Sequence, residues 1–171
     1  GTNTTGAANV AVGRGALQVN TTGGFNTAVG TGSSTENTTA SNNTAFGGEA
    51  MKKTTTASSN TAVGTSALAC NTTGATNVAL GMQALKANTT GEHNTAVGHN
   101  SLLANLTANQ NVAVGNESLG SNTEGNYNVA IGRLALYENT TASNNIAIGL
   151  SALEKNTTGH DNVAVGCGAL F

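Results

Sequence analysis

The sequence is a tandem repeat with a period of 17 residues. The string Asn-x-Ala-(Val/Phe/Leu/Ile)-Gly occurs ten times, each 17 residues after the previous one, and no insertion or deletion interrupts the series. A fixed period of this kind is typical of solenoids, in which stacked units bury a shared core. We therefore expect a single repeat domain over residues 1–171. Its motifs begin at Asn9, Asn26, Asn43, Asn60, Asn77, Asn94, Asn111, Asn128, Asn145 and Asn162.

The repeat is too short for helices. Helix-pair repeats run to about 33 residues or more. The leading segment is short, rich in β-branched residues and closed by Gly, which suits a strand that ends in a tight bend. The sequence therefore predicts an all-β protein, a parallel β-solenoid (β-roll) with one coil per repeat. Ten coils at ~4.8 Å each would make a rod of roughly 48 Å, and two repeats per coil would halve that length.

With the leading Asn numbered as position 1, the same residue types return at fixed positions. Ala holds position 3 and Gly position 5 in all ten units, and Leu or Met holds position 9 in all but one, where Ser34 stands. Position 12 is a second Asn column, broken only by Thr54. Stacked Asn side chains hydrogen-bond along β-structures, so both Asn columns are expected to form structural ladders. The position-12 members are Asn3, Asn20, Asn37, Asn71, Asn88, Asn105, Asn122, Asn139 and Asn156.

The alternation of side chains along a strand decides which motif residues face the core. We expect the residues at positions 2 and 4 to point inward and the invariant Ala at position 3 to point outward, crowded against other copies of the chain. The opposite orientation, with Ala inside and Val outside, is the alternative. The candidate subunit contact is therefore the column Ala11, Ala28, Ala45, Ala62, Ala79, Ala96, Ala113, Ala130, Ala147 and Ala164.

Charged residues make up 8% of the chain, and the formal net charge is −2. They lie just after the Gly, just before the second Asn and just before the next leading Asn, and only Glu124 enters a consensus position. These three stretches are expected to be solvated corners. No basic patch or aromatic platform suits nucleic acid, and no apolar stretch approaches the ~20 residues of a membrane span. No signal peptide is recognised, so an exported protein would be a mature chain or a fragment.

The sequence predicts a non-enzyme with no catalytic, cofactor-binding or metal-binding residues. A zinc site needs three or four converging Cys, His or acidic ligands, but His93, His99 and His160 fall at corner positions. Asp161 is the only Asp, whereas calcium-binding β-rolls need one in each turn. No nucleophile with a neighbouring base can be assembled from the repeat.

Two features with chemical potential are interpreted as structural or incidental. Cys70 and Cys167 lie nearly six repeats apart, too far along a rod for a disulfide, and are expected to be free thiols. Asn-x-Thr/Ser sequons recur at position 12, where we interpret Asn and Thr as ladder residues rather than as glycosylation acceptors.

The unit at residues 60–74, Asn-Thr-Ala-Val-Gly-Thr-Ser-Ala-Leu-Ala-Cys-Asn-Thr-Thr-Gly, closely resembles repeats of phage and bacterial tail-fibre proteins. Such arrays often precede a C-terminal self-cleaving chaperone domain. The Asn-x-Ala-Val-Gly-x-x-Ala-Leu core is also similar to the head repeat of trimeric autotransporter adhesins, where three left-handed β-rolls pack about an axis. The resemblance covers all ten units and implies a homotrimeric rod. The adhesin repeat is shorter than 17 residues, so the shape of the coil is expected to differ, and we do not expect the chaperone domain to be part of this rod.

The first functional hypothesis is a structural rod. We expect a homotrimeric shaft or head segment of a tail fibre or adhesin, located outside the cell on a virion or cell surface. Any receptor or glycan on a host surface would contact the variable corners. Residues 1 and 171 have the same phase and neither end carries a capping sequence, so we expect a piece of a longer array or rods stacked head to tail.

The alternative hypothesis is an ice-binding protein with a Thr ladder on its surface. The core string is somewhat similar to the Asn-x-Val-x-Gly repeat of grass ice-binding proteins. Leu106 and Glu124 interrupt the paired Thr columns, which counts against a surface that must match ice. Thr is also common in β-structure without any role in ice binding. The candidate ice face is Thr21, Thr38, Thr55, Thr72, Thr89, Thr140 and Thr157.

Overall fold

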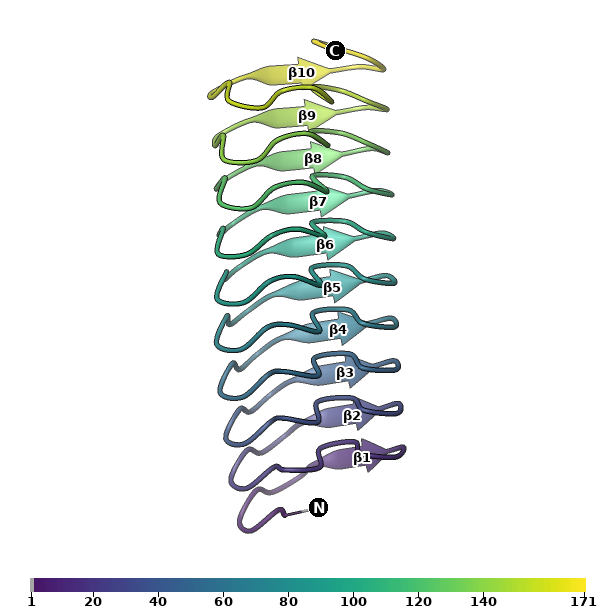
Figure 1. Ribbon diagram of the computed structural model, residues 1–171, viewed down its shortest axis with the longest axis vertical. Helices are drawn as coiled ribbons and strands as arrows, with labels where there is room; N and C mark the ends of the chain where they lie inside the picture. Colours follow the sequence, from purple (N-terminus) through teal and green to yellow (C-terminus); the bar gives the residue numbers. More distant parts are fainter. Residues whose placement is uncertain (1) are drawn as a thin grey trace.

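The computed structural model describes residues 2–171, which form a β-solenoid of stacked coils (Figure 1). Each coil contributes one three-residue strand, and all ten strands form a single parallel sheet in chain order. The described residues contain no helix. The strands are β1 (Val10–Val12), β2 (Thr27–Val29), β3 (Thr44–Phe46), β4 (Thr61–Val63), β5 (Val78–Leu80), β6 (Thr95–Val97), β7 (Val112–Val114), β8 (Val129–Ile131), β9 (Ile146–Ile148) and β10 (Val163–Val165).

Neighbouring strands pair with an offset of one repeat. Ala11 lies opposite Ala28, Ala28 opposite Ala45, and the same register continues to Ala147 and Ala164. Each 17-residue unit is therefore one coil, which confirms the predicted fold class and the predicted number of coils per repeat. An indel-free sequence gives this result because every residue stacks on its equivalent in the next coil.

Hydrogen bonds between coils continue outside the strands. In the first coil, the Leu17 N–H donates to the carbonyl oxygen of Ser33 at 3.1 Å, and the Thr21 N–H donates to that of Thr38 at 2.9 Å. Equivalent bonds recur in the later coils. Three-residue strands suffice because most of the coil circumference is tied to its neighbours by backbone bonds.

The core is narrow and is filled by small residues. Between the second and ninth coils the position-3 Ala side chains are buried inside the coil, together with the position-9 residues, which are Leu or Met except for Ser34. Ser118 at position 8 donates to the carbonyl oxygen of Ala130 at 2.8 Å, so positions 3 and 8 of adjacent coils lie against each other. A side chain as small as that of Ala at position 3 suits this close packing.

The predicted orientation of the motif is therefore wrong. The invariant Ala points inward, and the residues at positions 2 and 4 point out to solvent, as the strand burial patterns show. The column from Ala28 to Ala164 is sealed inside each coil and makes no subunit contact, and Ala11 is exposed only because it lies in the terminal coil. The physical reason is space, because Leu at position 9 already fills the core.

The Gly at position 5 is required by the backbone. Gly81 has a φ of +136°, which L-residues rarely adopt, and a Cβ there would lie 2.5 Å from the carbonyl oxygen of Gly98. The same geometry recurs along the column. The bend that ends each strand therefore brings successive coils too close for any side chain.

Candidate functional site

The position-1 asparagines form a buried chain along the rod. The backbone N–H of Asn26 donates to Oδ1 of Asn9 at 2.9 Å, and Nδ2 of Asn26 donates to the carbonyl oxygen of Ala40 at 2.8 Å. The pattern repeats up to Asn162. Each side chain thus joins its own coil to the next one, since Oδ1 of Asn26 in turn accepts from the backbone N–H of Asn43, and it holds the corner that leads into the strand.

The position-12 asparagines form a second ladder, in which side chains bond directly to one another. Nδ2 of Asn88 donates to Oδ1 of Asn71 at 2.9 Å, and the series continues without a gap to Asn156. Thr54 interrupts the ladder, and its buried Oγ1 has no hydrogen-bond partner among the described residues. All of the position-12 asparagines except Asn122 are also sequon residues, and the Asn88 amide, for example, donates both to Asn71 and to the carbonyl oxygen of Gly91.

In most Thr pairs, the hydroxyl of the first residue donates a hydrogen bond to a backbone carbonyl of the next coil. Oγ1 of Thr21 donates to the carbonyl oxygen of Thr38 at 2.9 Å, and Thr38, Thr55, Thr72 and Thr89 make the same bond to the next coil. Hydrogen bonding within the rod therefore accounts for this column. The second residue of the pair is exposed, at Thr22, Thr39, Thr56, Thr73, Thr90, Thr107, Thr141 and Thr158.

The outer face of the sheet is made by positions 2 and 4. Every position-4 residue is a bulky apolar residue, and six of the ten are classed as exposed, with Phe46 and Val12 each 56% exposed. The column is Val12, Val29, Phe46, Val63, Leu80, Val97, Val114, Ile131, Ile148 and Val165. Position 2 alongside it holds Val10, Thr27, Thr44, Thr61, Val78, Thr95, Val112, Val129, Ile146 and Val163.

The sheet face is large enough to be a contact surface. Ten strands at ~4.8 Å make it roughly 48 Å long, and side chains at two positions make it about 10 Å wide, or roughly 500 Å². The largest apolar patch of a typical soluble monomer is about 300–600 Å² and is often functional. The sheet face reaches this size, although four of its position-2 residues are Thr. Sequence reasoning missed this face because it placed positions 2 and 4 in the core.

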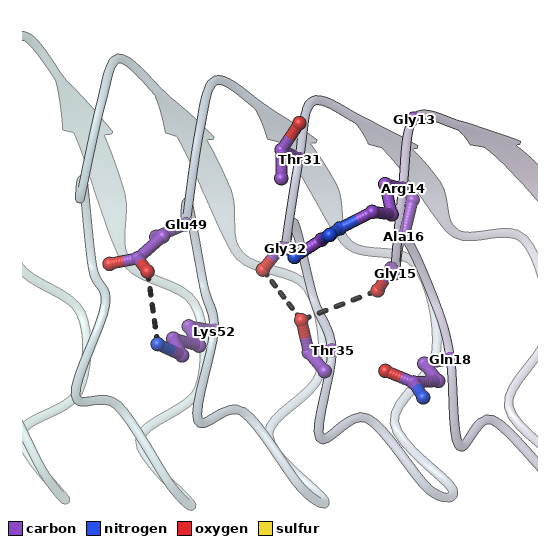
Figure 2. Close-up of a pocket in the computed structure, with 10 residues that line it drawn as sticks. All are labelled: Gly13, Arg14, Gly15, Ala16, Gln18, Thr31, Gly32, Thr35, Glu49 and Lys52. Carbon is purple, nitrogen blue, oxygen red and sulfur yellow. Dashed lines mark hydrogen bonds and ion pairs between the residues drawn. The ribbon is translucent and has the colours of Figure 1, made fainter.

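The opposite side of the Gly bend is a variable edge, which we define as positions 6, 7 and 10. Figure 2 shows a shallow hollow there in the first three coils, floored by the backbone of Gly15 and Gly32. The Arg14 side chain extends along the hollow, and Thr35 donates from Oγ1 to the carbonyl oxygen of Gly32 at 2.7 Å. Lys52 Nζ bonds Glu49 Oε1 at 3.0 Å, the one ion pair within residues 2–171.

A second hollow lies on the same edge, farther along the rod. It is lined by residues of three successive coils, the sixth to the eighth. Tyr137 and Leu103 stand at its two ends, and Gly120 lies between them in the same column. The remaining lining residues are Asn100, Ala104, Glu117 and Ser121.

The predicted corner residues lie apart from one another. No group of three or more His, Cys, Asp or Glu that could hold a metal ion occurs within residues 2–171. His99 Nδ1 lies 3.1 Å from Asn116 Nδ2, and His160 Nδ1 accepts from the backbone N–H of Ser143 at 3.0 Å. Cys70 and Cys167 are both free. Residues 2–171 also include no helix that is long and apolar enough to cross a membrane.

Comparison of the chain with protein-family models, with curated proteins and with solved structures gives no match. The most distinctive surface of the rod is the sheet face, with its continuous apolar column at position 4.

Proposed function

We propose that the chain is a structural, non-catalytic rod, a shaft or head segment of an extracellular tail fibre or surface adhesin that spaces or presents binding parts. We further propose that it assembles as a homotrimer through the sheet face. The observation that carries the proposal is the position-4 column, which is open to solvent in a single chain and apolar in all ten coils. A column that remained in water would not need to be apolar throughout.

The shape of the face favours self-association over a small partner. A contact of about 500 Å² on each chain gives roughly 1,000 Å² in total, near the lower bound for specific interfaces. A cyclic arrangement about an axis parallel to the rod would bring equivalent coils of each copy to the same height, so the apolar columns would meet along their whole length. In a trimer each chain contacts two neighbours, and each neighbour would cover one edge of the sheet face.

The ladders suit a mechanical role. Coils bonded around their circumference, with Asn side chains tying each corner to the next, resist local opening because an unpaired buried amide is costly. The number of repeats sets the length of such a rod, and its stability grows with nearest-neighbour contacts between units.

The solution mass tests the proposal. Light scattering is expected to give a particle near three times 16.8 kDa. Ile131→Lys would place three ammonium groups at the buried contact and is expected to dissociate the trimer, because unpaired buried charges cost several kcal/mol. Leu150→Lys is the matched control, since Leu150 is an exposed aliphatic residue on the variable edge.

Two results contradict the proposal. One is a wild-type particle of 16.8 kDa across the accessible concentration range. The other is dissociation by Leu150→Lys to the same degree as by Ile131→Lys, since the contact would then not lie on the sheet face. Circular dichroism of both variants separates dissociation from unfolding.

Ice binding is the second candidate function, and the regular exposed column from Thr22 to Thr158 is the observation that favours it. Glu124 interrupts this column, and a single column is narrower than the sheet face, so we favour the rod. Thermal hysteresis above that of a control protein at equal concentration would support ice binding, and its absence at high concentration would remove it.

A further inference from the structure

The hollow between Leu103 and Tyr137 forms because a glycine lies between two large side chains at the same repeat position. Both residues stand at position 10, and Gly120 holds the same position in the coil between them. A Cβ on Gly120 would lie 3.0 Å from Cε2 and 3.1 Å from Cδ2 of Tyr137, closer than ordinary packing allows. The missing side chain at Gly120 therefore lets the Cδ2–Cε2 edge of the tyrosine ring approach the backbone, and a slot remains beside the ring.

The backbone around the slot is held rigidly. The Ala104 N–H donates to the carbonyl oxygen of Gly120, and the Ser121 N–H donates to that of Tyr137, both at 3.1 Å. The Glu117 N–H donates to the carbonyl oxygen of His99 at 2.9 Å. A ligand would thus meet a preformed surface and would order little beyond a few side chains.

The polar groups of the slot are not committed to one another. Glu117 is half-buried, and its carboxylate makes neither an ion pair nor a side-chain hydrogen bond within residues 2–171. The buried Oδ1 of Asn100, beside it at position 7 of the previous coil, has no hydrogen-bond partner within the same residues. Buried polar atoms without partners are uncommon in folded proteins, and each calls for an explanation such as a ligand or ordered water.

We infer that this slot is a carbohydrate site that takes one ring of a neutral saccharide. An aromatic face and an aliphatic side chain suit the apolar C–H face of a sugar ring, while a carboxylate and a hydroxyl suit its hydroxyl groups. Tyr137 and Leu103 supply the apolar surfaces, and Glu117 and Ser121 supply the hydrogen bonds. An apolar peptide would leave the carboxylate unpaired, and an acidic ligand would be repelled by it.

The inference goes beyond the rod and is independent of its assembly. None of the lining residues belongs to position 2 or 4, so self-association through the sheet face leaves the slot open. A monomeric chain would keep the site as well, and a trimer would carry three copies of it.

The chain supplies its own probe for the test. It has no Trp and only two Tyr residues, so Tyr127→Phe leaves Tyr137 as the only tyrosine. We would titrate this variant with neutral oligosaccharides of glucose, galactose, mannose and N-acetylglucosamine, following tyrosine fluorescence and its quenching by acrylamide. At least one saccharide is expected to give a saturable change and to protect Tyr137 from the quencher.

Binding by variants locates the site on an array of the same saccharides. Tyr137→Leu is expected to weaken retention about tenfold or more through loss of stacking. Glu117→Gln is expected to weaken it less. Tyr127→Leu is the matched control, because Tyr127 is an exposed tyrosine at position 17, and it is expected to bind as wild type.

Three outcomes overturn the inference. They are the absence of a saturable signal with any saccharide, equal retention of wild type and Tyr137→Leu, and stronger retention of acidic peptides than of saccharides. Ile131→Lys separates the two proposals, because a carbohydrate site survives that change even where the trimer is lost.

Discussion

Thr54→Asn should stabilise the rod by repairing the interrupted Asn ladder. In the unbroken part, each position-12 amide donates to the Asn before it and to a carbonyl three residues on, as Asn88 does to Asn71 at 2.9 Å and to Gly91 at 3.0 Å. At Thr54 neither bond exists, and a buried hydroxyl is left without a partner. The backbone there matches the other coils, since the Thr54 N–H donates to the carbonyl oxygen of Met51 at 3.1 Å as its equivalents do.

The expected gain follows from the number of bonds restored. The introduced amide reaches Asn37 on one side and the carbonyl oxygen of Ala57 within its own coil, and its oxygen accepts from Asn71. Two to three side-chain bonds with a net value of 0.5–1.5 kcal/mol each give about 1–4.5 kcal/mol. Removal of the unpartnered hydroxyl acts in the same direction, and the similar size of Thr and Asn limits the steric cost.

The assay is urea unfolding at fixed protein concentration, combined with amide hydrogen exchange, because coils of a solenoid can open locally. Slower exchange is expected for the amides of residues 51–72. The matched control is Asn122→Thr, which creates the same gap in the unbroken ladder and should cost a similar amount by leaving Asn105 and Asn139 without their partner. A neutral or destabilising Thr54→Asn beside a costly Asn122→Thr would refute the ladder argument.

Two further substitutions test the backbone. Thr76→Asn should raise the free energy of unfolding by about 0.5–1 kcal/mol, because Thr76 is an exposed β-branched residue at a φ of 61° that Asn tolerates better. Thr73→Asn is the control at an exposed neighbouring position. Equal stability of Thr76→Asn and the wild type would contradict the prediction. Gly81→Ala should cost about 3 kcal/mol or more, from left-handed strain and a clash with the carbonyl of Gly98. Its control is Gly48→Ala, where the nearest atom to an added Cβ lies 4.0 Å away, and similar unfolding midpoints for the two variants would show that the close approach is not limiting.

The fold could be predicted because a repeat period without insertions or deletions allows successive coils to stack in only one register. The 17-residue spacing fixes Ala11 on Ala28 and each Asn on its equivalent, whatever the shape of the coil. The shape itself was not predictable from periodicity. Alternation along the strand allowed either Ala or its neighbours to face inward, and the choice depended on the width of a core that no single repeat reveals.

The sequence did contain a signal for the correct orientation. Position 4 varies from Val to Phe46 and Leu80 within three coils, whereas positions 8 and 9 of the Phe46 and Leu80 coils hold Ala with Met51 or Leu85, which are similar in size. A close-packed core does not accept such changes in volume without strain, whereas a solvent face does. Ala at position 3, Ala or Ser at position 8 and Leu or Met at position 9 nearly all keep their size from coil to coil, as the interior of a narrow rod requires.

The slot at Gly120 was harder to find, because it depends on a contact between coils rather than on a repeat position. Its residues lie at positions where any residue type occurs, and only the register places Gly120 under the ring of Tyr137. From the sequence this edge is expected to be variable and solvated, whereas the residues that line the slot are half-buried or buried. The volumes of side chains in three neighbouring coils could not be compared before the register was known.

How far the residue type varies at one repeat position indicates the surroundings of that position in the rod. Buried columns keep one residue size, ladder columns keep one hydrogen-bonding group, and the exposed position 6 drifts freely among Arg14, Met82, His99 and Cys167. Position 4 fits none of these classes, since it varies in size as a free surface does and yet never becomes polar. Contact with a second apolar surface reconciles the two, because such a surface can adapt to different volumes but excludes water and charge from the whole length of the column.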